Sequence, residues 1–392
     1  MSNSARPLRI ALAAGEASGD LLGAGLIEAI RRRAPDAEFF GIAGPGMVAA
    51  GCAPWYRTEE LSVMGLAEVL RHLPRLLRLR RRLIKRLQSA RPDVFIGIDS
   101  PDFNLPVEAA LKKGGVPTVQ YVSPQVWAWR QSRVAGIREA ADLVLCVLPF
   151  ETEFYATHGV NSVFVGHPLA DQVPLEVNAP DARQRLELPV SVPTLAVLPG
   201  SRSAEVARLA RPFLQTGKWL QDRHPGLQVV IALANEATRE RYLQETRGIE
   251  LDPAPRLIVA RAREVMTAAD VVLTASGTAS LEAALLKRPM VVAYIISGLT
   301  HRLLRVLGLN KLEHFSLPNL LAGRAVVPEF LQAQVRPGVL GPALEKYLDH
   351  PNERQEWHDT FEAIHRQLRR NASDGAADAV LGQLREGAGR RQ

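Results

Sequence analysis

The chain has 392 residues, a net charge of +7 and only two cysteines. This length exceeds the roughly 250–300 residues at which a single hydrophobic core stops growing, so two domains are expected. A hydrophobic fraction of 47% with 23% charged residues excludes a disordered chain. Cys52 and Cys146 cannot build a disulfide framework and lack CxxC spacing, so no zinc site is expected and a reducing compartment fits.

The positive charge favours an anionic partner, which is nucleic acid, anionic lipid or a phosphorylated substrate, and does not choose among them. An arginine-rich solvated surface explains the same charge. Residues 1–7 carry no long apolar segment before a cleavage site, and no run of about 18 apolar residues occurs later in the chain. We therefore expect no signal peptide and no membrane-spanning helix, in a protein that is soluble or peripheral.

The first half of the chain alternates strand-like and helix-like segments. Short apolar runs bounded by Gly, Pro or Asp predict strands, and the longer segments between them predict helices. This alternation is typical of an α/β fold with a doubly wound parallel sheet and helices on both faces. We expect strands at residues 8–14, 38–41, 94–99, 117–122 and 143–148, and helices at 20–33, 105–113 and 130–140.

A proline-rich segment that begins at residues 166–168 separates this half from a second α/β set. The sequence therefore predicts two doubly wound parallel-sheet domains that face each other across a cleft, with ligands at the carboxyl ends of the strands. The helical C-terminal tail is expected to pack back across the domains or onto the partner protomer of a homodimer. The expected boundaries are 1–167 for the first domain, 168–193 for the linker, 194–341 for the second domain and 342–392 for the tail.

The loop after the expected strand at 194–198 has the features of an anion site. It opens a helix, whose N-terminal N–H groups and dipole favour negative charge. Gly200 lets the backbone of Gly200 and Ser201 approach a ligand, and Arg202 adds a bidentate donor suited to a diphosphate. A serine-capped helix with a surface arginine is the alternative that this loop alone leaves open.

A second strand-to-helix loop, at 274–284, supports the nucleotide interpretation. The small residues Ser276, Gly277 and Thr278 leave backbone donors open to a ligand. Glu282, in the first turns of the helix, can accept hydrogen bonds from the vicinal hydroxyls of a ribose, or it can simply offset the helix dipole. No GxxxxGK[ST] occurs, and residues 15–20 are not GxGxxG, so a P-loop ATPase and a dinucleotide site are not expected.

Three loops of the first half are expected at one edge of the sheet, at residues 15–20, 99–104 and 123–130. Asp99 ends an apolar strand, so partial desolvation would make its carboxylate a stronger base. Asp102 is expected to be a cap or turn residue. Trp127 and Trp129 fit packing or stacking on a sugar ring, and we expect packing for at least one. A lone His167 is expected to be structural.

The segment at residues 62–88 mixes leucines with arginines. Pro74 is expected to divide it into two helices. In the second helix, leucines that face the core and arginines that face water are the stronger interpretation. The first helix instead suits an anionic membrane surface. We therefore predict a membrane-facing segment near 62–88, with acyl or lipid contacts from Val63, Met64, Leu66, Val69, Leu70 and Leu73.

Together these motifs resemble the lipid-A-disaccharide synthase family, which consists of GT-B-fold glycosyltransferases of outer-membrane lipid biosynthesis. The resemblance covers most of the chain, in the order of the family, and the motifs are specific as a set but not singly. Ser100 and Gly46 depart slightly from the family pattern, and residues 307–314 match less clearly. The matching stretches are 14–20, 97–104, 123–130, 166–168, 198–202, 276–279 with 281–282, and 316–321.

The resemblance implies that UDP-2,3-diacylglucosamine and 2,3-diacylglucosamine 1-phosphate (lipid X) are joined to give the β-1,6-linked lipid A disaccharide 1-phosphate and UDP. It also implies a peripheral location on the cytoplasmic face of the inner membrane of a Gram-negative bacterium. By the same resemblance Asp99 is the base, and Glu16 belongs to a first-domain loop important to the family. Arg202 would grip the diphosphate, Glu282 would hold the ribose, and Asn319 would lie near the phosphates or the donor sugar.

We expect neither a metal nor a cofactor, because no Asp-x-Asp follows a strand and Arg202 with helix N-termini can stabilise a leaving diphosphate. A UDP-sugar epimerase or another transferase, such as a peptidoglycan one, is the nearest alternative in the same fold. A non-catalytic lipid-binding scaffold is a further alternative. Nucleic-acid binding is disfavoured, because the basic residues are not interleaved with exposed aromatic residues and no reader motif occurs.

Overall fold

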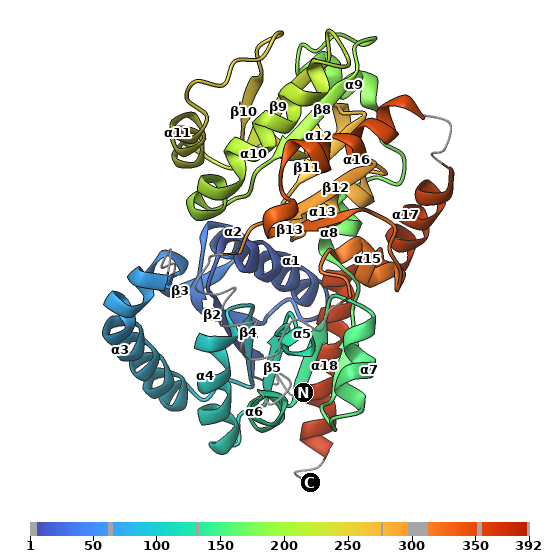
Figure 1. The fold of residues 1–392 in the computed structure, drawn as a ribbon. Coiled ribbons are helices and arrows are strands. Elements are labelled where there is room, and N and C mark those ends of the chain that lie inside the picture. The colour runs from blue at the N-terminus through green and yellow to red at the C-terminus, as the bar shows by residue number, and fades with distance from the viewer. Residues whose placement is uncertain are drawn as a thin grey trace. The chain divides into compact units, whose positions relative to one another are not determined.

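The computed structural model describes residues 6–61, 66–129, 133–275, 277–296, 313–350 and 355–389. The chain forms two compact units (Figure 1). The first contains residues 1–171 and 368–392, and the second contains residues 172–367. In the described ranges, no helix has both the length and the apolar character needed to cross a bilayer.

The first unit is built on a seven-stranded parallel sheet with the order β3-β2-β1-β4-β5-β6-β7. The chain builds outward from β1 to β3 and then returns to add β4 on the other side of β1. The connections that follow β1 and β4 therefore run in opposite directions along the sheet, and a topological switch point lies between these two strands. The strands are β1 (Arg9–Ala14), β2 (Glu38–Ala43), β3 (Cys52–Arg57), β4 (Val94–Ile98), β5 (Thr118–Tyr121), β6 (Leu143–Cys146) and β7 (Ser162–Phe164).

Helices cover both faces of this sheet. Successive residues of a strand point to opposite faces. A Cβ on Gly97 would meet side chains of α4, whereas the Ile98 side chain lies against Gly19 and Gly23 of α1. The helices are α1 (Ala17–Arg33), α2 (Pro45–Ala49), α3 (Leu66–Ala90), α4 (Pro101–Lys113), α5 (Val126–Trp129), α6 (Val134–Ala140), α7 (Phe150–Ala156), α8 (Pro168–Gln172), which ends at the unit boundary, and α18 (Ala372–Gly389); η1 (Thr58–Glu60) is a 3-10 turn.

The second unit repeats the same topology with six parallel strands, in the order β10-β9-β8-β11-β12-β13. Its switch point lies between β8 and β11. The strands are β8 (Thr194–Leu198), β9 (Gln228–Leu233), β10 (Arg256–Val259), β11 (Val271–Thr274), β12 (Met290–Tyr294) and β13 (Glu329–Leu331). The helices are α9 (Ala179–Arg185), α10 (Ser203–Gln221), α11 (Glu236–Glu245), α12 (Ala262–Ala268), α13 (Thr278–Leu285), α15 (Leu317–Ala322), α16 (Pro337–Asp349) and α17 (Gln355–Leu368), with the 3-10 turn η3 (Gln332–Gln334). The predicted fold class, two doubly wound α/β domains with a helical tail, is confirmed.

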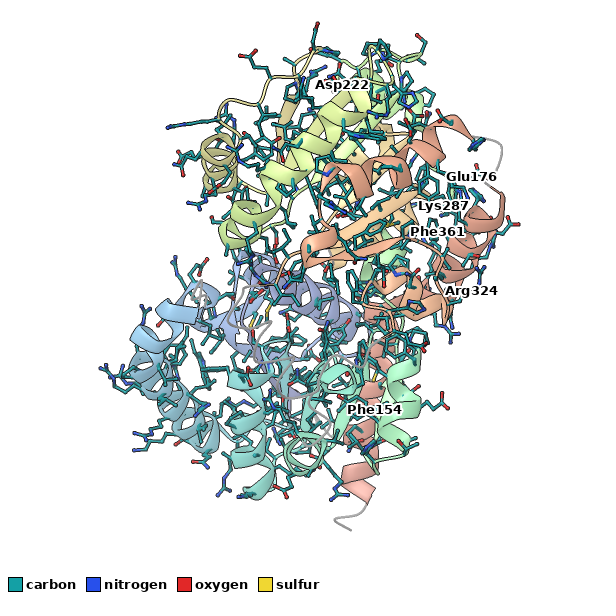
Figure 2. The ribbon with its side chains drawn as sticks, viewed as in Figure 1. Phe154, Glu176, Asp222, Lys287, Arg324 and Phe361 are labelled. Carbon is teal, nitrogen blue, oxygen red and sulfur yellow. The ribbon has the colours of Figure 1, made fainter. Side chains whose placement is uncertain are left out.

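The helical tail is divided between the units. Helix α16 packs on α10, and α17 buries Phe361 and Ile364 in the second unit (Figure 2). Helix α18 belongs to the first unit and packs on α1. Gly25 of α1 allows this close approach, because a Cβ there would lie 2.5 Å from Ser373 Oγ. The two units meet in the sequence at 171/172 and 367/368. The sequence patterns instead predict a linker at 168–193 and a separate tail from residue 342.

Pro74 does not divide the basic segment, so the expectation of two helices was wrong. A single helix, α3, runs from Leu66 to Ala90 with Pro74 inside it. Proline removes one helical hydrogen bond and costs about 3 kcal/mol in a helix interior. Pro74 is exposed, where water can solvate the carbonyl left unpaired, and the buried side chains of Leu79, Leu83 and Leu87 anchor the second half to the core.

Asp20 joins the first two helices of the chain. Its carboxylate is 7% exposed and accepts hydrogen bonds from three backbone N–H groups at the start of α2, those of Gly44 at 2.9 Å, Gly46 at 2.8 Å and Met47 at 3.0 Å. Since a helix N-terminus has unpaired N–H groups, the carboxylate caps α2 from a neighbouring helix. Asp20 therefore has a structural role in the loop that the sequence singled out.

Asp20→Ala should lower the free energy of unfolding by about 3 kcal/mol, because buried N–H groups lose a charged acceptor. The measurement is urea unfolding followed by circular dichroism, with the exposed Asp36→Ala as the matched control. A loss no larger than that of the control would show that water replaces the carboxylate.

Candidate functional site

The loops after β1 and β4 are in contact at the switch point of the first unit. A Cβ on Gly15 would lie only 2.0 Å from Ser100 Oγ, so only glycine allows this approach. Glu16 and Asp99 consequently stand in adjacent loops. Glu16 is exposed at the N-cap of α1, where its side chain makes no capping hydrogen bond.

Asp99 lies in a strained turn that buried amides support. Asp99 and Ser100 have φ values of 53° and 44°, a region that side chains other than glycine rarely adopt. The side-chain amides of Asn104 and Gln120 donate to the Asp99 carbonyl at 2.9 Å and 3.3 Å, and its N–H donates to the Tyr121 carbonyl at 2.9 Å. These bonds hold the half-buried Asp99 at the end of the sheet.

Besides Asp20, which caps α2, these loops carry three carboxylates that differ in their partners. Within the described residues, the carboxylates of Asp99 and Glu16 have no hydrogen bond or ion pair, whereas Asp102 pairs with Arg133 at 2.5 Å. Asp102 lies in the first turn of α4 and its side chain is 82% exposed. Asp99 is therefore the half-buried carboxylate of this edge that is available to a ligand.

Trp127 of the third loop packs inside the protein. Its ring makes an edge contact with Phe150, at 4.8 Å between centroids, and its Nε1 donates to Glu151 Oε1 at 3.2 Å. Burial raises the pKa of Glu151 to about 7, although hydrogen bonds such as that from the Leu148 N–H oppose the shift. The expectation of packing is met at Trp127, and the side chain of Trp129 lies outside the described residues.

His167 has a structural environment, as the sequence suggested. Its Nδ1 accepts from the Leu169 N–H at 3.2 Å, and its backbone N–H donates to the Leu368 carbonyl at 2.8 Å. Burial lowers the pKa of His167 to about 4, so the ring is neutral near pH 7. The backbone of His167 thus joins the segment that leaves the first unit to Leu368, and the ring accepts a hydrogen bond from the start of α8.

The loop after β8 already holds a carboxylate. Gly200 has a φ of 121°, and the N–H groups of Ser201 and Arg202 donate to Glu205 Oε2 at 3.1 Å and 3.3 Å. Tyr294 donates its hydroxyl to Glu205 Oε1 at 3.3 Å, and its pKa is raised by burial and by Glu205. The expected anion-binding geometry is present, with Glu205 in the place of an external anion.

Sequence reasoning missed this role of Glu205, although a signal existed. Glutamate at the third position of a helix often reaches back to the N-terminal N–H groups. Arg202 itself is exposed, with Nη1 3.8 Å from Glu205 Oε1, so its guanidinium is open to a ligand.

The loop after β11 presents Gly277 and Thr278 at the start of α13, and both residues are exposed. Gly277 has a φ of 122°, which favours glycine. Glu282 Oε1 accepts from Arg263 Nε at 2.7 Å. Arg263 was missed, because it lies on another helix and no local pattern links it to Glu282. Ser276 lies outside the described residues.

Asn319 is buried, and both its amide oxygen and its amide nitrogen make hydrogen bonds. Its Oδ1 accepts from the N–H groups of Val326 and Val327 at 2.7 Å and 2.9 Å, and its Nδ2 donates to the Val327 carbonyl at 2.9 Å. In this structure the amide of Asn319 shapes the turn before β13.

The candidate lipid-contacting residues are only partly described. Val63 and Met64 lie outside the described residues, as do the side chains of Leu66, Val69 and Leu70, whose backbone belongs to α3. Leu73 is 42% exposed. Along the rest of α3, the exposed basic side chains are Arg75, Arg78, Arg81, Arg82, Lys85 and Arg86.

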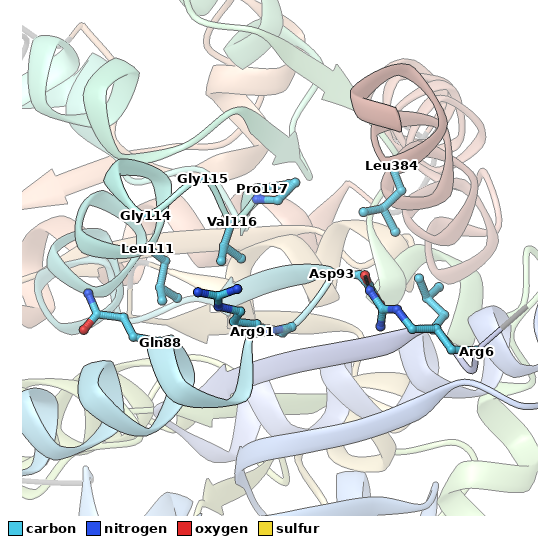
Figure 3. A pocket seen from close by; sticks show the side chains of 12 residues that line it. Arg6, Gln88, Arg91, Asp93, Leu111, Gly114, Gly115, Val116, Pro117 and Leu384 are labelled. Atoms are coloured by element: carbon cyan, nitrogen blue, oxygen red, sulfur yellow. Dashed lines mark hydrogen bonds and ion pairs between the residues drawn. The ribbon is translucent and has the colours of Figure 1, made fainter. Parts of the chain in front are cut away.

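A cavity of about 870 Å³ opens at the opposite edge of the first sheet (Figure 3). Its lining includes Arg6, Gln88, Arg91 and Asp93, and the Arg6 guanidinium pairs with Asp93. This edge holds the amino ends of β1, β4 and β5. Since ligands of doubly wound sheets bind at the carboxyl ends, the cavity is not the candidate active site.

The described residues contain one group with suitable geometry for a metal, formed by His224, Glu345 and Asp349. Arg223 Nε lies 3.8 Å from Glu345 Oε1 and offsets the charge of this group. The group lies at the end of α10 and on α16, and it belongs to neither switch-point loop.

Solved structures with this arrangement include nucleotide-sugar enzymes. The UDP-GlcNAc 2-epimerase of Neisseria meningitidis, solved with UDP-GlcNAc, matches with a TM-score of 0.66 at 12% identity, over 96% of this chain and 100% of that chain. The glycotransferase of kitacinnamycin matches with a TM-score of 0.60 at 18% identity, over 97% of this chain and 100% of that chain. Two doubly wound units with this topology define the GT-B fold class.

Sequence comparison decides the family within this class. The family model described as lipid-A-disaccharide synthetase matches residues 10–380. The lipid-A-disaccharide synthase of Pseudomonas aeruginosa strain LESB58 is 53% identical over 375 residues, which are 95% of this chain and 97% of that protein. The chain belongs to the lipid-A-disaccharide synthase family. Membership places it among the glycosyltransferases of lipid A disaccharide synthesis, and confirms the resemblance noted in the sequence.

Proposed function

We propose that the chain transfers 2,3-diacylglucosamine from its UDP derivative to 2,3-diacylglucosamine 1-phosphate, with inversion at the anomeric carbon. The products are the β-1,6-linked lipid A disaccharide 1-phosphate and UDP. The observation that carries the proposal is the available Asp99 carboxylate at one switch point, combined with the anion-holding loop at the equivalent switch point of the second unit. Family membership supplies the substrate class.

Asp99 acts as the general base in this proposal. Its carboxylate takes the proton of the acceptor 6-hydroxyl as that oxygen bonds to the anomeric carbon of the donor. The bond from this carbon to the UDP oxygen breaks, and UDP leaves on the opposite face. The supported turn fixes the backbone that carries the carboxylate, which reduces the reorganisation needed in the transition state. Glu16, in the adjacent loop, is proposed to help orient the acceptor.

The loops of the second unit are proposed to bind UDP. The N–H groups of Ser201 and Arg202 would receive the diphosphate when Glu205 turns away, and the Arg202 guanidinium would add positive charge. These groups can stabilise the leaving diphosphate, so we propose metal-independent transfer. Gly200 lets the ligand approach the backbone.

The ribose is proposed to bind Glu282. Arg263 occupies Oε1 of this carboxylate, and Oε2 is proposed to accept the ribose hydroxyls. The backbone of Ser276, Gly277 and Thr278 would complete the nucleotide site at the start of α13. Asn319 is proposed to act through the turn at 326–327 that its amide holds.

The start of α3 is proposed to contact the cytoplasmic face of the inner membrane. The exposed arginines farther along α3, such as Arg75 and Arg78, would attract anionic lipid, and the apolar residues from Val63 to Leu73 would enter the interface. Both proposed substrates carry acyl chains, so an apolar contact next to the acceptor-side unit would shorten their path from the membrane.

The decisive experiment incubates the full chain with the two proposed substrates, detergent and EDTA, and quantifies products. Equal amounts of UDP and disaccharide 1-phosphate are expected. Asp99→Asn should lower kcat at least ~100-fold, the usual contribution of a general base, whereas Asp102→Asn in the same loop should stay near the wild-type rate. A near-normal rate for Asp99→Asn would remove it as the base, and UDP binding without product would redirect the assays to epimerisation.

Arg202→Ala should weaken the binding of UDP about tenfold, because a charge-assisted contact to the diphosphate is lost. Isothermal titration should show no comparable change for uridine, which lacks phosphate. Arg211→Ala, an exposed arginine on the same helix, is the control. Unchanged UDP affinity in Arg202→Ala would place the diphosphate elsewhere.

Replacing Met64 and Leu66 with serine should reduce cosedimentation with anionic vesicles, because the variant loses apolar surface that enters the interface. The control replaces Leu243 and Val190, which are 44% and 65% exposed in the second unit. Equal vesicle binding by both double variants would place the membrane contact outside this segment.

A further inference from the structure

A buried acid lies behind the Asp99 turn and has no role in the proposed function. Glu108 of α4 is fully buried, and both of its carboxyl oxygens lack a hydrogen-bond partner within the described residues. A buried carboxylate without partners would be strongly unfavourable. Glu108 is therefore expected to be protonated, or to have a partner that its ionised form requires.

Glu108 lies on the same face of α4 as Asn104, which is one helical turn earlier. Both side chains lie against Gly97 of β4, because a Cβ on Gly97 would meet Glu108 Oε1 at 2.2 Å and Asn104 Cγ at 3.1 Å. Gln120 is the register partner of Gly97 on β5, so its side chain points to the same face of the sheet. Because Gly97 has no side chain, there is room next to it for a polar cluster of Asn104, Glu108 and Gln120, close to the Asp99 turn.

The cluster has too few hydrogen-bond donors if Glu108 is ionised. The Asn104 and Gln120 amide nitrogens donate to main-chain carbonyls, including that of Asp99. The amide oxygens of both residues are buried and unpaired in the described structure. An ionised carboxylate is only an acceptor, so a protonated Glu108 is the member of the cluster that can supply a donor.

The surrounding charges agree with a neutral acid. Burial raises the pKa of Glu108 to about 8, and Asp142 adds to the increase while Lys112 opposes it. The Lys112 ammonium is engaged by Asp142 at 3.0 Å and by the carbonyls of Arg138 and Ala141. It is therefore not free to neutralise a Glu108 carboxylate.

We propose that Glu108 is a positioning residue, which acts as a protonated acid and donates a hydrogen bond to the amide oxygen of Asn104. This bond fixes the amide, so that its NH2 group holds the Asp99 carbonyl and the strained turn. The proposal rests on the proposed role of Asp99 as the base. Loss of the Glu108 proton places two acceptors face to face, which loosens the turn and lowers turnover at alkaline pH.

The kinetic test compares Glu108→Gln and Glu108→Leu with the wild type across pH 6 to 10. Glutamine keeps a neutral hydrogen-bond donor at every pH. The kcat of Glu108→Gln should therefore stay within about threefold of the wild-type value and should not decline at alkaline pH. Leucine removes the hydrogen-bond donor and should lower kcat about tenfold, with the KM for the UDP-sugar unchanged. An unaltered alkaline decline in Glu108→Gln, or a wild-type kcat in Glu108→Leu, would overturn the proposal.

A second measurement does not depend on turnover. The folded-state pKa of Glu108 lies above its usual value of 4.5, so its contribution to stability is lost as pH rises from about 4.5 towards 8. Glu108→Gln should therefore raise Tm relative to the wild type at pH 8 and not at pH 5. The exposed Glu139→Gln is the control.

The two measurements distinguish the possible failures. An equal Tm difference at both pH values would show that Glu108 is not held protonated, and would overturn the inference even if Glu108→Leu fails to fold. A wild-type rate in Asp99→Asn together with the expected Tm behaviour of Glu108→Gln would instead overturn the proposed role of Asp99.

Discussion

The reversal of strand order next to β1 and β8 is the constraint on which both candidate sites depend. At this point two parallel strands send their chains in opposite directions, so the space beyond their carboxyl ends is not filled by a crossing connection. In the first unit this space receives the loops that carry Glu16 and Asp99, and in the second unit it receives those that carry Arg202 and Glu282. One topology thus provides both candidate sites, and the residues of the loops determine how the two sites differ.

Buried polar groups fix the loops at the carboxyl ends of the strands in the first unit. Asp20 caps α2, Glu151 holds Trp127, and the amides of Asn104 and Gln120 hold the carbonyl of Asp99. Each such group is unfavourable to bury unless its hydrogen bonds are satisfied, so each bond also selects one conformation of its loop. The strained backbone at Asp99 shows the result, because left-handed φ values persist only where the surroundings impose them.

Local sequence patterns were sufficient to predict the central strands and the positions of the main loops. Apolar runs placed most of these strands, and small residues before helices located the loops after β8 and β11. Contacts between distant segments were not predictable in this way. Arg263 reaches Glu282 from another helix, and Asn319 uses its amide to hold a turn seven residues later. Pro74 led to a wrong prediction, because helix propensity is a weak rule where buried leucines hold the next turns in place.

In the proposed UDP site, the carboxylate of Glu205 would link stability to ligand binding in the second unit. It satisfies N–H groups that would otherwise be unpaired at the start of α10, and it carries the same sign of charge as a diphosphate. A diphosphate that uses these N–H groups must displace it, so the net gain in binding is the difference between two anions and not the full strength of the site. The exposed Arg202 guanidinium can supply this difference, since a diphosphate offers it more oxygens than a single carboxylate does. Glu205 therefore holds this loop in its conformation, and in the proposed function the preference for a diphosphate would depend on Arg202.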